Sequence, residues 1–331
     1  MTNSSTIGVP TIGVFDSGFG GLTVLRALVA RMPQARYAFL GDTARLPYGS
    51  KSRRTIARYA AESARFLVLE QGAEFLVIAC NTASALALDA IQDSVSVPVL
   101  GVIQPGAAAA RAVSRTGHVL VLATDATVQS HAYTATCNAL GLRALEKACP
   151  LLVPLVEEGW TTDLDTNTNM GAPDLDSETW ESKTILLTNA PQVEVTRTVI
   201  RIYLDEILAA ATAENLQPDT LVLGCTHYPL LRPLIEQAVP PGMRVIDSAD
   251  SAADAAVQLV NGRLAPQIAP VAASAPTYQA DSPASSGESE SAIQPTPIRC
   301  FATDSVEKFS RLGSRFLGRP VGDVQLVDLG G

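Results

Sequence analysis

The stretch LVIACNT at residues 76–82 has a near-copy in the second half of the chain, LVLGCTH at residues 221–227. Each begins with an apolar run typical of a buried parallel strand, and each ends in a cysteine followed within two residues by a threonine. If a helix follows each strand, each thiol lies near a helix N-terminus, where the dipole lowers the thiol pKa. The repeat therefore predicts two thiols, Cys80 and Cys225, one in each half of a quasi-symmetric protein.

Two thiols on opposite faces of a substrate could take a proton from one face of a carbon and return one to the other. Packing is the alternative for either cysteine taken alone, because free cysteine is among the most buried residue types. The repeated context favours function for Cys80 and Cys225. We interpret Cys137, Cys149 and Cys300, which lack that context, as packing residues.

Strand-like apolar runs alternate with helix-like stretches along the chain, which is the pattern of parallel sheets covered by helices. We expect an α/β fold of two pseudo-symmetric lobes with parallel-type sheets and the active site in the cleft between them. The first lobe is predicted to be discontinuous, formed by residues 1–105 and 218–331, and the second to be formed by residues 106–217. Strands are expected at 11–15, 37–40, 97–101 and 118–123, and helices at 52–71, 128–140 and 191–214.

The net charge of −9 over 331 residues comes from two segments that look like surface insertions. Residues 161–182 hold six acidic residues and residues 265–297 hold three, and neither contains Lys or Arg. Outside them, 24 acidic residues balance 24 basic ones, so nucleic-acid binding, which needs a basic stripe, is not expected. The Ala-, Ser- and Pro-rich segment 265–297 is predicted to be a disordered or solvated loop.

The five cysteines show no CxxC spacing, and no second ligand pair accompanies Cys225 and His227, so we expect no metal site. The N-terminus lacks the pattern of an export signal, and no apolar run reaches about 18 residues. A disulfide framework is therefore not expected either. These observations predict a cytoplasmic protein with free thiols and no membrane partner.

The sequence DSGFGG at residues 16–21 follows a predicted strand and precedes a predicted helix. A dinucleotide-binding fingerprint fails, because Thr23 stands where the third glycine is required. Two interpretations remain: a tight turn of small residues, or a cradle of backbone N–H groups for a carboxylate. Asp16 could accept a hydrogen bond from an ammonium group or orient a thiol.

Other polar residues lie beside the predicted strand ends. His227 could be a base or an orienting partner for Cys225, although a lone histidine is more often structural. Thr124 and Thr127 could hold a charged group of a substrate, and helix capping is the alternative.

Five motifs, in this order and spanning nearly the whole chain, resemble those of the bacterial glutamate racemase family. They are DSGFGGL at 16–22, GDT at 41–43 with PYG at 47–49, ACNTAS at 79–84, CPLLVP at 149–154 and GCTHYPLL at 224–231. The resemblance implies a cofactor-independent racemase with two α/β lobes. It implies that Cys80 acts as base on D-glutamate and Cys225 on L-glutamate, with the other thiol as acid each time.

The resemblance also implies supporting roles for other residues. Asp16 and His227 would assist the thiols, and Asp42 and Glu157 would bear on catalysis, although Glu158 adjoins Glu157. Positions that match substrate-holding residues, besides Asp16 and His227, are Ser17, Pro47, Tyr48, Gly49, Asn81, Thr82, Thr124, Thr127 and Thr226.

A cofactor-free racemase must acidify the α-proton through close positioning, water exclusion and donors aimed at the developing carbanion. Most racemases instead use pyridoxal phosphate, which needs a lysine that the cysteine motifs lack. The resemblance implies a supply of D-glutamate for peptidoglycan and, as partner, a second copy in a homodimer. The alternatives are racemization of aspartate or another acidic amino acid, and a non-catalytic amino-acid-binding protein of the same fold.

Overall fold

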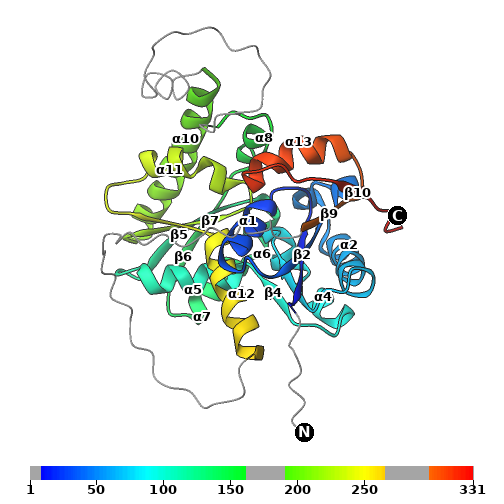
Figure 1. The fold of residues 1–331 in the computed structure, drawn as a ribbon. Helices are drawn as coiled ribbons and strands as arrows, with labels where there is room; N and C mark the ends of the chain where they lie inside the picture. Colours follow the sequence, from blue (N-terminus) through cyan, green and yellow to red (C-terminus); the bar gives the residue numbers. More distant parts are fainter. Residues whose placement is uncertain (1–8, 162–190, 265–297, 331) are drawn as a thin grey trace, which may run out of the picture.

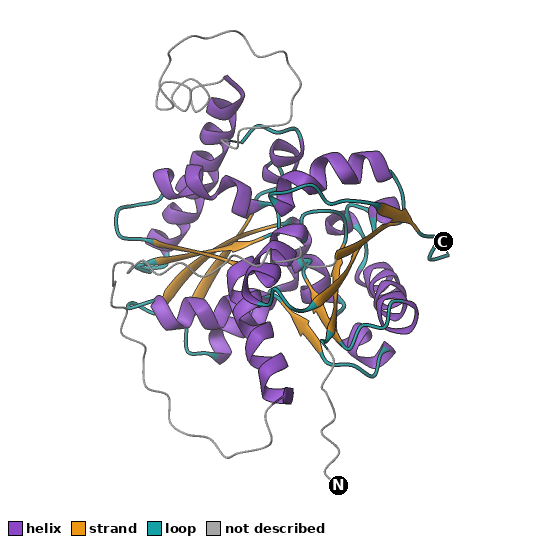
Figure 2. Cartoon of the chain, viewed as in Figure 1, coloured by secondary structure: helices purple, strands orange, loops and turns teal. Residues whose placement is uncertain are grey.

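The computed structural model describes residues 9–161, 191–264 and 298–330. Two parallel sheets form its centre, with helices against them (Figures 1 and 2). The two predicted insertions, 161–182 and 265–297, lie outside the described residues, except for Thr161. The predictions made for these two segments therefore also lie outside the described residues.

The first sheet has six parallel strands in the order β10-β9-β2-β1-β3-β4. Their bounds are Thr11–Asp16 for β1, Arg36–Gly41 for β2, Phe75–Ile78 for β3, Val99–Gly101 for β4, Ile298–Ala302 for β9 and Val324–Leu326 for β10. The second sheet has four parallel strands in the order β6-β5-β7-β8. Their bounds are His118–Ala123 for β5, Arg143–Ala148 for β6, Thr220–Gly224 for β7 and Arg244–Asp247 for β8.

Four strands of each sheet share one order. These units are β2-β1-β3-β4 and β6-β5-β7-β8. In each, the first strand in the chain lies between the second and the third, and the fourth lies next to the third. In such doubly wound units a ligand binds beyond the carboxyl ends of the strands, where the order reverses. Cys80 follows the third strand of one unit and Cys225 the third strand of the other. The predicted α/β fold with two pseudo-symmetric lobes is confirmed.

Helices pack on both lobes. In the first lobe they are α1 (Leu22–Arg31), α2 (Arg53–Arg65), α3 (Asn81–Leu86), α4 (Leu88–Ser94) and α13 (Val306–Leu317), with short turns at Thr43–Arg45, Tyr48–Ser50 and Phe66–Glu70. In the second lobe they are α5 (Ile103–Val113), α6 (Asp125–Ser130), α7 (Ala132–Ala139), α8 (Leu152–Glu157), α10 (Pro191–Ala213), α11 (Arg232–Ala238) and α12 (Ser248–Leu264), with a 3-10 turn, η4, at Tyr228–Leu231. No helix of the described residues combines the length and apolar character needed to cross a membrane.

The lobes share one hydrophobic core. Val14 of β1 and Leu122 of β5 belong to the same buried cluster, whereas the next residue of β1, Phe15, packs in a separate cluster with Ile56 of α2. Helix α12 packs against α1 and α5, and Arg31 of α1 forms ion pairs with Asp250 at 3.0 Å and Asp254 at 2.5 Å. The shared core holds the carboxyl ends of the two sheets at fixed positions relative to each other.

One predicted boundary is wrong. Residues 218–331 were assigned to the first lobe, but β7 and β8 pair in the second sheet beside β5. The chain returns to the first sheet only at β9, after α12. An apolar run shows that a strand is buried but not which strand it pairs with, because pairing depends on how the connecting helices pack.

Two predicted helices differ in detail from the structure, and two strands lack a prediction. The helix expected at 128–140 is two helices, because His131 between α6 and α7 has φ 54°. The helix expected at 52–71 ends as α2 at Arg65 and continues as a π-helical turn. Strands β6 and β9 were not predicted. Residues 143–148 read RALEKA, which has no long apolar run, because β6 is a half-buried edge strand of its sheet.

Candidate active site

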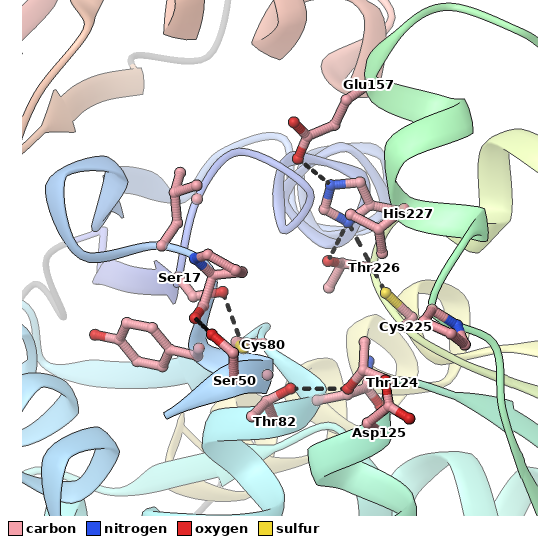
Figure 3. Close-up of a pocket in the computed structure, with 18 of the residues that line it drawn as sticks. Ser17, Ser50, Cys80, Thr82, Thr124, Asp125, Glu157, Cys225, Thr226 and His227 are labelled. Atoms are coloured by element: carbon pink, nitrogen blue, oxygen red, sulfur yellow. Dashed lines mark hydrogen bonds and ion pairs between the residues drawn. The ribbon is translucent and has the colours of Figure 1, made fainter. Parts of the chain in front are cut away.

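A cavity of about 290 Å³ opens where the carboxyl ends of both sheets meet, and both cysteines line it (Figure 3). Ser17, Cys80, Thr124 and Cys225 reach it from the ends of β1, β3, β5 and β7. The predicted site residues that line it are Ser17, Pro47, Tyr48, Gly49, Cys80, Asn81, Thr82, Thr124, Glu157, Cys225, Thr226 and His227. Asp16, Asp42 and Thr127 are predicted site residues that lie behind this lining.

Cys80 is held at the N-terminus of α3. The backbone N–H of Ala83 donates to its Sγ at 3.4 Å, and the thiol donates to Ser17 Oγ at 3.3 Å. Burial, and after it the charge of the nearby Asp16 carboxylate, raise the pKa of Cys80 to about 12. The expectation of a lowered pKa is wrong for this thiol, because loss of solvation outweighs the dipole of a six-residue helix.

Asp16 lies directly behind Ser17, at the end of β1, with 1% of its surface exposed. The backbone N–H of Gly18 donates to its Oδ2 at 2.9 Å, while no described residue donates to the buried Oδ1. Burial raises the pKa of Asp16, and the charge of His227 opposes that shift. Asp16 therefore provides an unused acceptor between the two thiol-bearing loops.

Cys225 has an imidazole partner, which Cys80 lacks. His227 Nδ1 lies 3.9 Å from Cys225 Sγ, and His227 Nε2 lies 3.4 Å from Glu157 Oε1 (Figure 3). Burial alone would lower the pKa of His227, but the contacts with Cys225 and Glu157 outweigh it and raise the pKa to about 10. At neutral pH the ring is therefore an imidazolium, which places a positive charge beside Cys225 Sγ.

Glu157 completes this row of charges. Burial would raise its pKa, but the ion pairs with His227 and Lys308 outweigh burial and lower it. Its Oε2 lies 3.4 Å from Lys308 Nζ, so each carboxylate oxygen has its own cation. The adjacent Glu158 is exposed and is not among the residues that line the cavity.

The glycine-rich turn at 16–21 contacts the second cysteine motif. A Cβ atom on Gly20 would lie 2.6 Å from the His227 ring and closer still to Thr226 Oγ1. Thr23, at the position that excluded the dinucleotide fingerprint, donates to the backbone carbonyl of Thr226 at 3.1 Å. The small residues of this turn therefore allow loops from the two lobes to touch, a reason that the local sequence did not reveal.

Threonine hydroxyls from the two lobes lie within hydrogen-bond distance of one another. Thr82 Oγ1 lies 3.1 Å from Thr124 Oγ1, which lies 3.0 Å from Thr127 Oγ1. Thr124 makes no side-chain capping hydrogen bond to α6, so capping does not account for it. Asn81 also bridges the lobes, since its Oδ1 accepts from Tyr133 at 2.7 Å and its Nδ2 donates to Ser248 at 3.4 Å.

Asp42 acts on the site through another residue. It is fully buried, and it accepts hydrogen bonds from Tyr48 Oη, from Arg45 Nε at 2.8 Å and from Thr303 Oγ1 at 2.9 Å. Tyr48 belongs to the Pro47–Gly49 loop that lines the cavity. Asp42 thus holds this loop and does not itself face the cavity.

Two titratable residues of the lining are not among the predicted site residues. Cys149, interpreted as a packing residue, lines the cavity, and burial raises its pKa to about 12. It follows β6 as Asp42 follows β2, so the strand order of the pseudo-repeat is the signal that could have found it. Asp125 lines the rim and left no signal in the sequence beyond its place after Thr124. Among the described residues, no three His, Cys, Asp or Glu side chains gather as metal ligands.

Known proteins are similar to this chain in both sequence and fold. Residues 12–167 match the model of the Asp/Glu/Hydantoin racemase family. The glutamate racemase of Koribacter versatilis is 49% identical over 326 residues, which is 97% of this chain and 98% of the relative. The crystal structure of a glutamate racemase isoform from Bacillus anthracis has a TM-score of 0.70 at 29% identity, covering 97% of this chain and 98% of that one. A glutamate racemase from Francisella tularensis, crystallised with D-glutamate, has a TM-score of 0.70 at 27% identity with the same coverage. The identity over nearly the full length of both chains shows that this chain belongs to the glutamate racemase family.

Proposed function

We propose that the protein racemizes glutamate by moving its α-proton between two thiols, Cys80 and Cys225, with no cofactor taking part. The observation that carries this proposal is that both thiols, from equivalent strands of the two sheets, line one cavity of about 290 Å³. A thiol on each side can serve as base for one enantiomer and as acid for the other.

The environments of the two thiols support one starting state. The His227 imidazolium lies beside Cys225 Sγ, and the raised pKa of Cys80 keeps that residue a thiol, so we assign the starting thiolate to Cys225. In this state Cys225 takes the α-proton of L-glutamate, and Cys80 then donates a proton to the opposite face. After this proton transfer Cys80 is a thiolate and Cys225 is a thiol. This form of the enzyme accepts D-glutamate and catalyses the reverse reaction.

Donors around the cavity supply the positioning that the weakly acidic α-proton requires. We assign the hydroxyls of Thr82, Thr124 and Thr226 and the amide of Asn81 to the substrate's charged groups. We assign Asp16, which lies behind Ser17, to the Cys80 half of the site, where its charge helps to keep the proton on that thiol. Fixed donors at a buried site stabilise developing charge without reorganisation, which is the usual source of such rate enhancement.

The test is an incubation of purified protein with L-glutamate in D2O, with reductant, EDTA and no added cofactor. Decay of the circular dichroism signal, together with α-deuterium in the product, is the expected result. Exchange with aspartate but not with glutamate would keep the mechanism and change the substrate. No exchange with either amino acid, in a protein that binds glutamate, would refute the proposal and support a binding protein.

Three further parts of the proposal concern the setting of the reaction. We propose that the product is D-glutamate for peptidoglycan, that the enzyme acts in the cytoplasm and that it is a homodimer. The five cysteines are all free, which suits a reducing compartment. Light scattering over a concentration series measures the mass, and a monomer at every concentration would contradict the dimer.

A further inference from the structure

Lys308, on the C-terminal helix α13, has no place in the two-thiol scheme, yet its ammonium group reaches the row of charges beside Cys225. Helix α13 follows β9 in the first lobe, whereas Glu157 ends α8 in the second, and Figure 1 shows these helices side by side. Lys308 Nζ lies 3.4 Å from Glu157 Oε2, and Glu157 Oε1 lies 3.4 Å from His227 Nε2. One carboxylate therefore links a cation of the first lobe to the imidazole of the second.

The same helix confines the imidazole from another side. Phe316 of α13 lies edge-on to the His227 ring with centroids 4.9 Å apart, and Phe19 lies 6.2 Å from it. Lys308 Nζ is 5.6 Å from the centroid of the Phe19 ring. Helix α13 thus sets both the apolar wall around His227 and the position of the carboxylate that His227 contacts.

We propose that Lys308 is a positioning residue for the Cys225 half of the site, holding the Glu157 carboxylate against His227. The inference rests on the proposed function, because it assigns the row Lys308–Glu157–His227 to the thiol that acts on L-glutamate. Without Lys308, Glu157 keeps a single cationic partner among the described residues and is free to turn toward solvent, since its side chain is 22% exposed. His227 then loses its carboxylate for part of the time.

The alternative role for Lys308 is that of a nearby positive charge. Such a charge repels the imidazolium, so its removal would raise the pKa of His227, whereas loss of the Glu157 contact would lower it. Four described groups face the imidazole or its carboxylate: Asp16 at the end of β1, Cys225 after β7, Glu157 of α8 and Lys308 of α13. Substitution of Lys308 leaves the other three in place, so the direction of the shift distinguishes the two roles.

The first experiment observes His227 directly and does not depend on activity. The chain has three histidines, so imidazole 15N resonances of the full-length protein can be assigned with His227→Asn. We expect Lys308→Met to lower the pKa of His227 by roughly one unit and Lys308→Arg to keep it near the wild-type value. In the Glu157→Gln background, Lys308→Met should shift it no further. An unchanged or raised pKa in Lys308→Met overturns the proposal.

The second experiment measures racemization at neutral pH. Lys308→Met should lower kcat/KM about threefold to tenfold, Lys308→Arg should restore most of the loss, and Lys308→Met should add less than about twofold to Glu157→Gln. Arg311→Met, which removes an exposed cation one turn further along α13, is the matched control and should leave kcat/KM unchanged. An effect on KM alone that vanishes at high salt and persists in Glu157→Gln would mean that Lys308 only attracts the anionic substrate, and would overturn the proposal. A wild-type protein that does not racemize glutamate refutes the proposed function, while the resonance titration still decides whether Lys308 positions Glu157.

Discussion

The two halves of the site carry the same nucleophile in different surroundings. Cys80 donates to a serine hydroxyl and has a carboxylate behind it, whereas Cys225 has an imidazole linked to Glu157 and Lys308. The backbone repeat places both thiols alike, since each follows the third strand of its unit. The difference teaches that a symmetric fold can give the same side chain unlike partners, a hydroxyl and a carboxylate beside one sulfur and an imidazolium beside the other.

The largest loss of activity is expected when either thiol is removed. Cys80→Ser and Cys225→Ser should each reduce racemization by at least about 10³-fold, because a serine hydroxyl is a far weaker acid than a thiol. The halves should still differ in deuterium exchange: Cys225→Ser should exchange only D-glutamate, and Cys80→Ser only L-glutamate. Cys300→Ser, in β9 and outside the cavity, is the control and should keep wild-type turnover. Exchange of both enantiomers by a single-thiol variant would contradict the two-base assignment.

The next test removes the partner of each thiol in turn. His227→Asn should lower kcat about 10²-fold, because it removes the cation beside Cys225. Ser17→Ala should lower kcat only about twofold to tenfold, since a neutral hydroxyl contributes one hydrogen bond to Cys80. Steady-state kinetics in both directions measure both effects. Equal losses in the two variants would show that the halves are supported alike.

A third test uses pH. His227 has a pKa of about 10 and Cys80 of about 12, so His227 loses its proton first as the pH rises. We expect kcat to be flat near neutrality and to fall about tenfold per unit above pH 10. The measurement uses kcat at saturation, because the substrate ammonium group also titrates in this range. If the His227→Asn variant shows the same fall of kcat above pH 10, that fall comes from the titration of another group.

The smallest effect on turnover is expected at Asp42, which lies behind the cavity. Asp42→Asn should lower kcat/KM only severalfold, because an amide oxygen is a weaker acceptor for the Tyr48 hydroxyl, and Tyr48→Phe, which removes the donor, should behave similarly. Asp42→Asn should also cost about 2–3 kcal/mol in the free energy of unfolding, because it leaves the guanidinium of Arg45, whose side chain is 11% exposed, with Glu62 alone. Urea unfolding measures this cost. A loss of turnover beyond about 10²-fold without a loss of stability would place Asp42 on the substrate.

Much of this molecule could be predicted from local patterns. The buried strands before Cys80 and Cys225 have long apolar runs, and the family resemblance is confirmed by relatives that cover nearly the whole chain. Pairing between strands could not be predicted in the same way, so β7 and β8 were assigned to the wrong sheet. The edge strand β6 lacks a long apolar run and was missed, and with it the position of Cys149 at the cavity.

The sequence by itself determined which side chains can do chemistry and which local element carries each of them. Only the tertiary structure decided the charge states, because a pKa depends on burial and on neighbours brought from distant parts of the chain. It raised the pKa of Cys80, which the helix N-terminus alone would lower, and it placed Glu157 and Lys308 beside His227. These contacts join residues separated by more than 60 positions, and no local pattern encodes such distances.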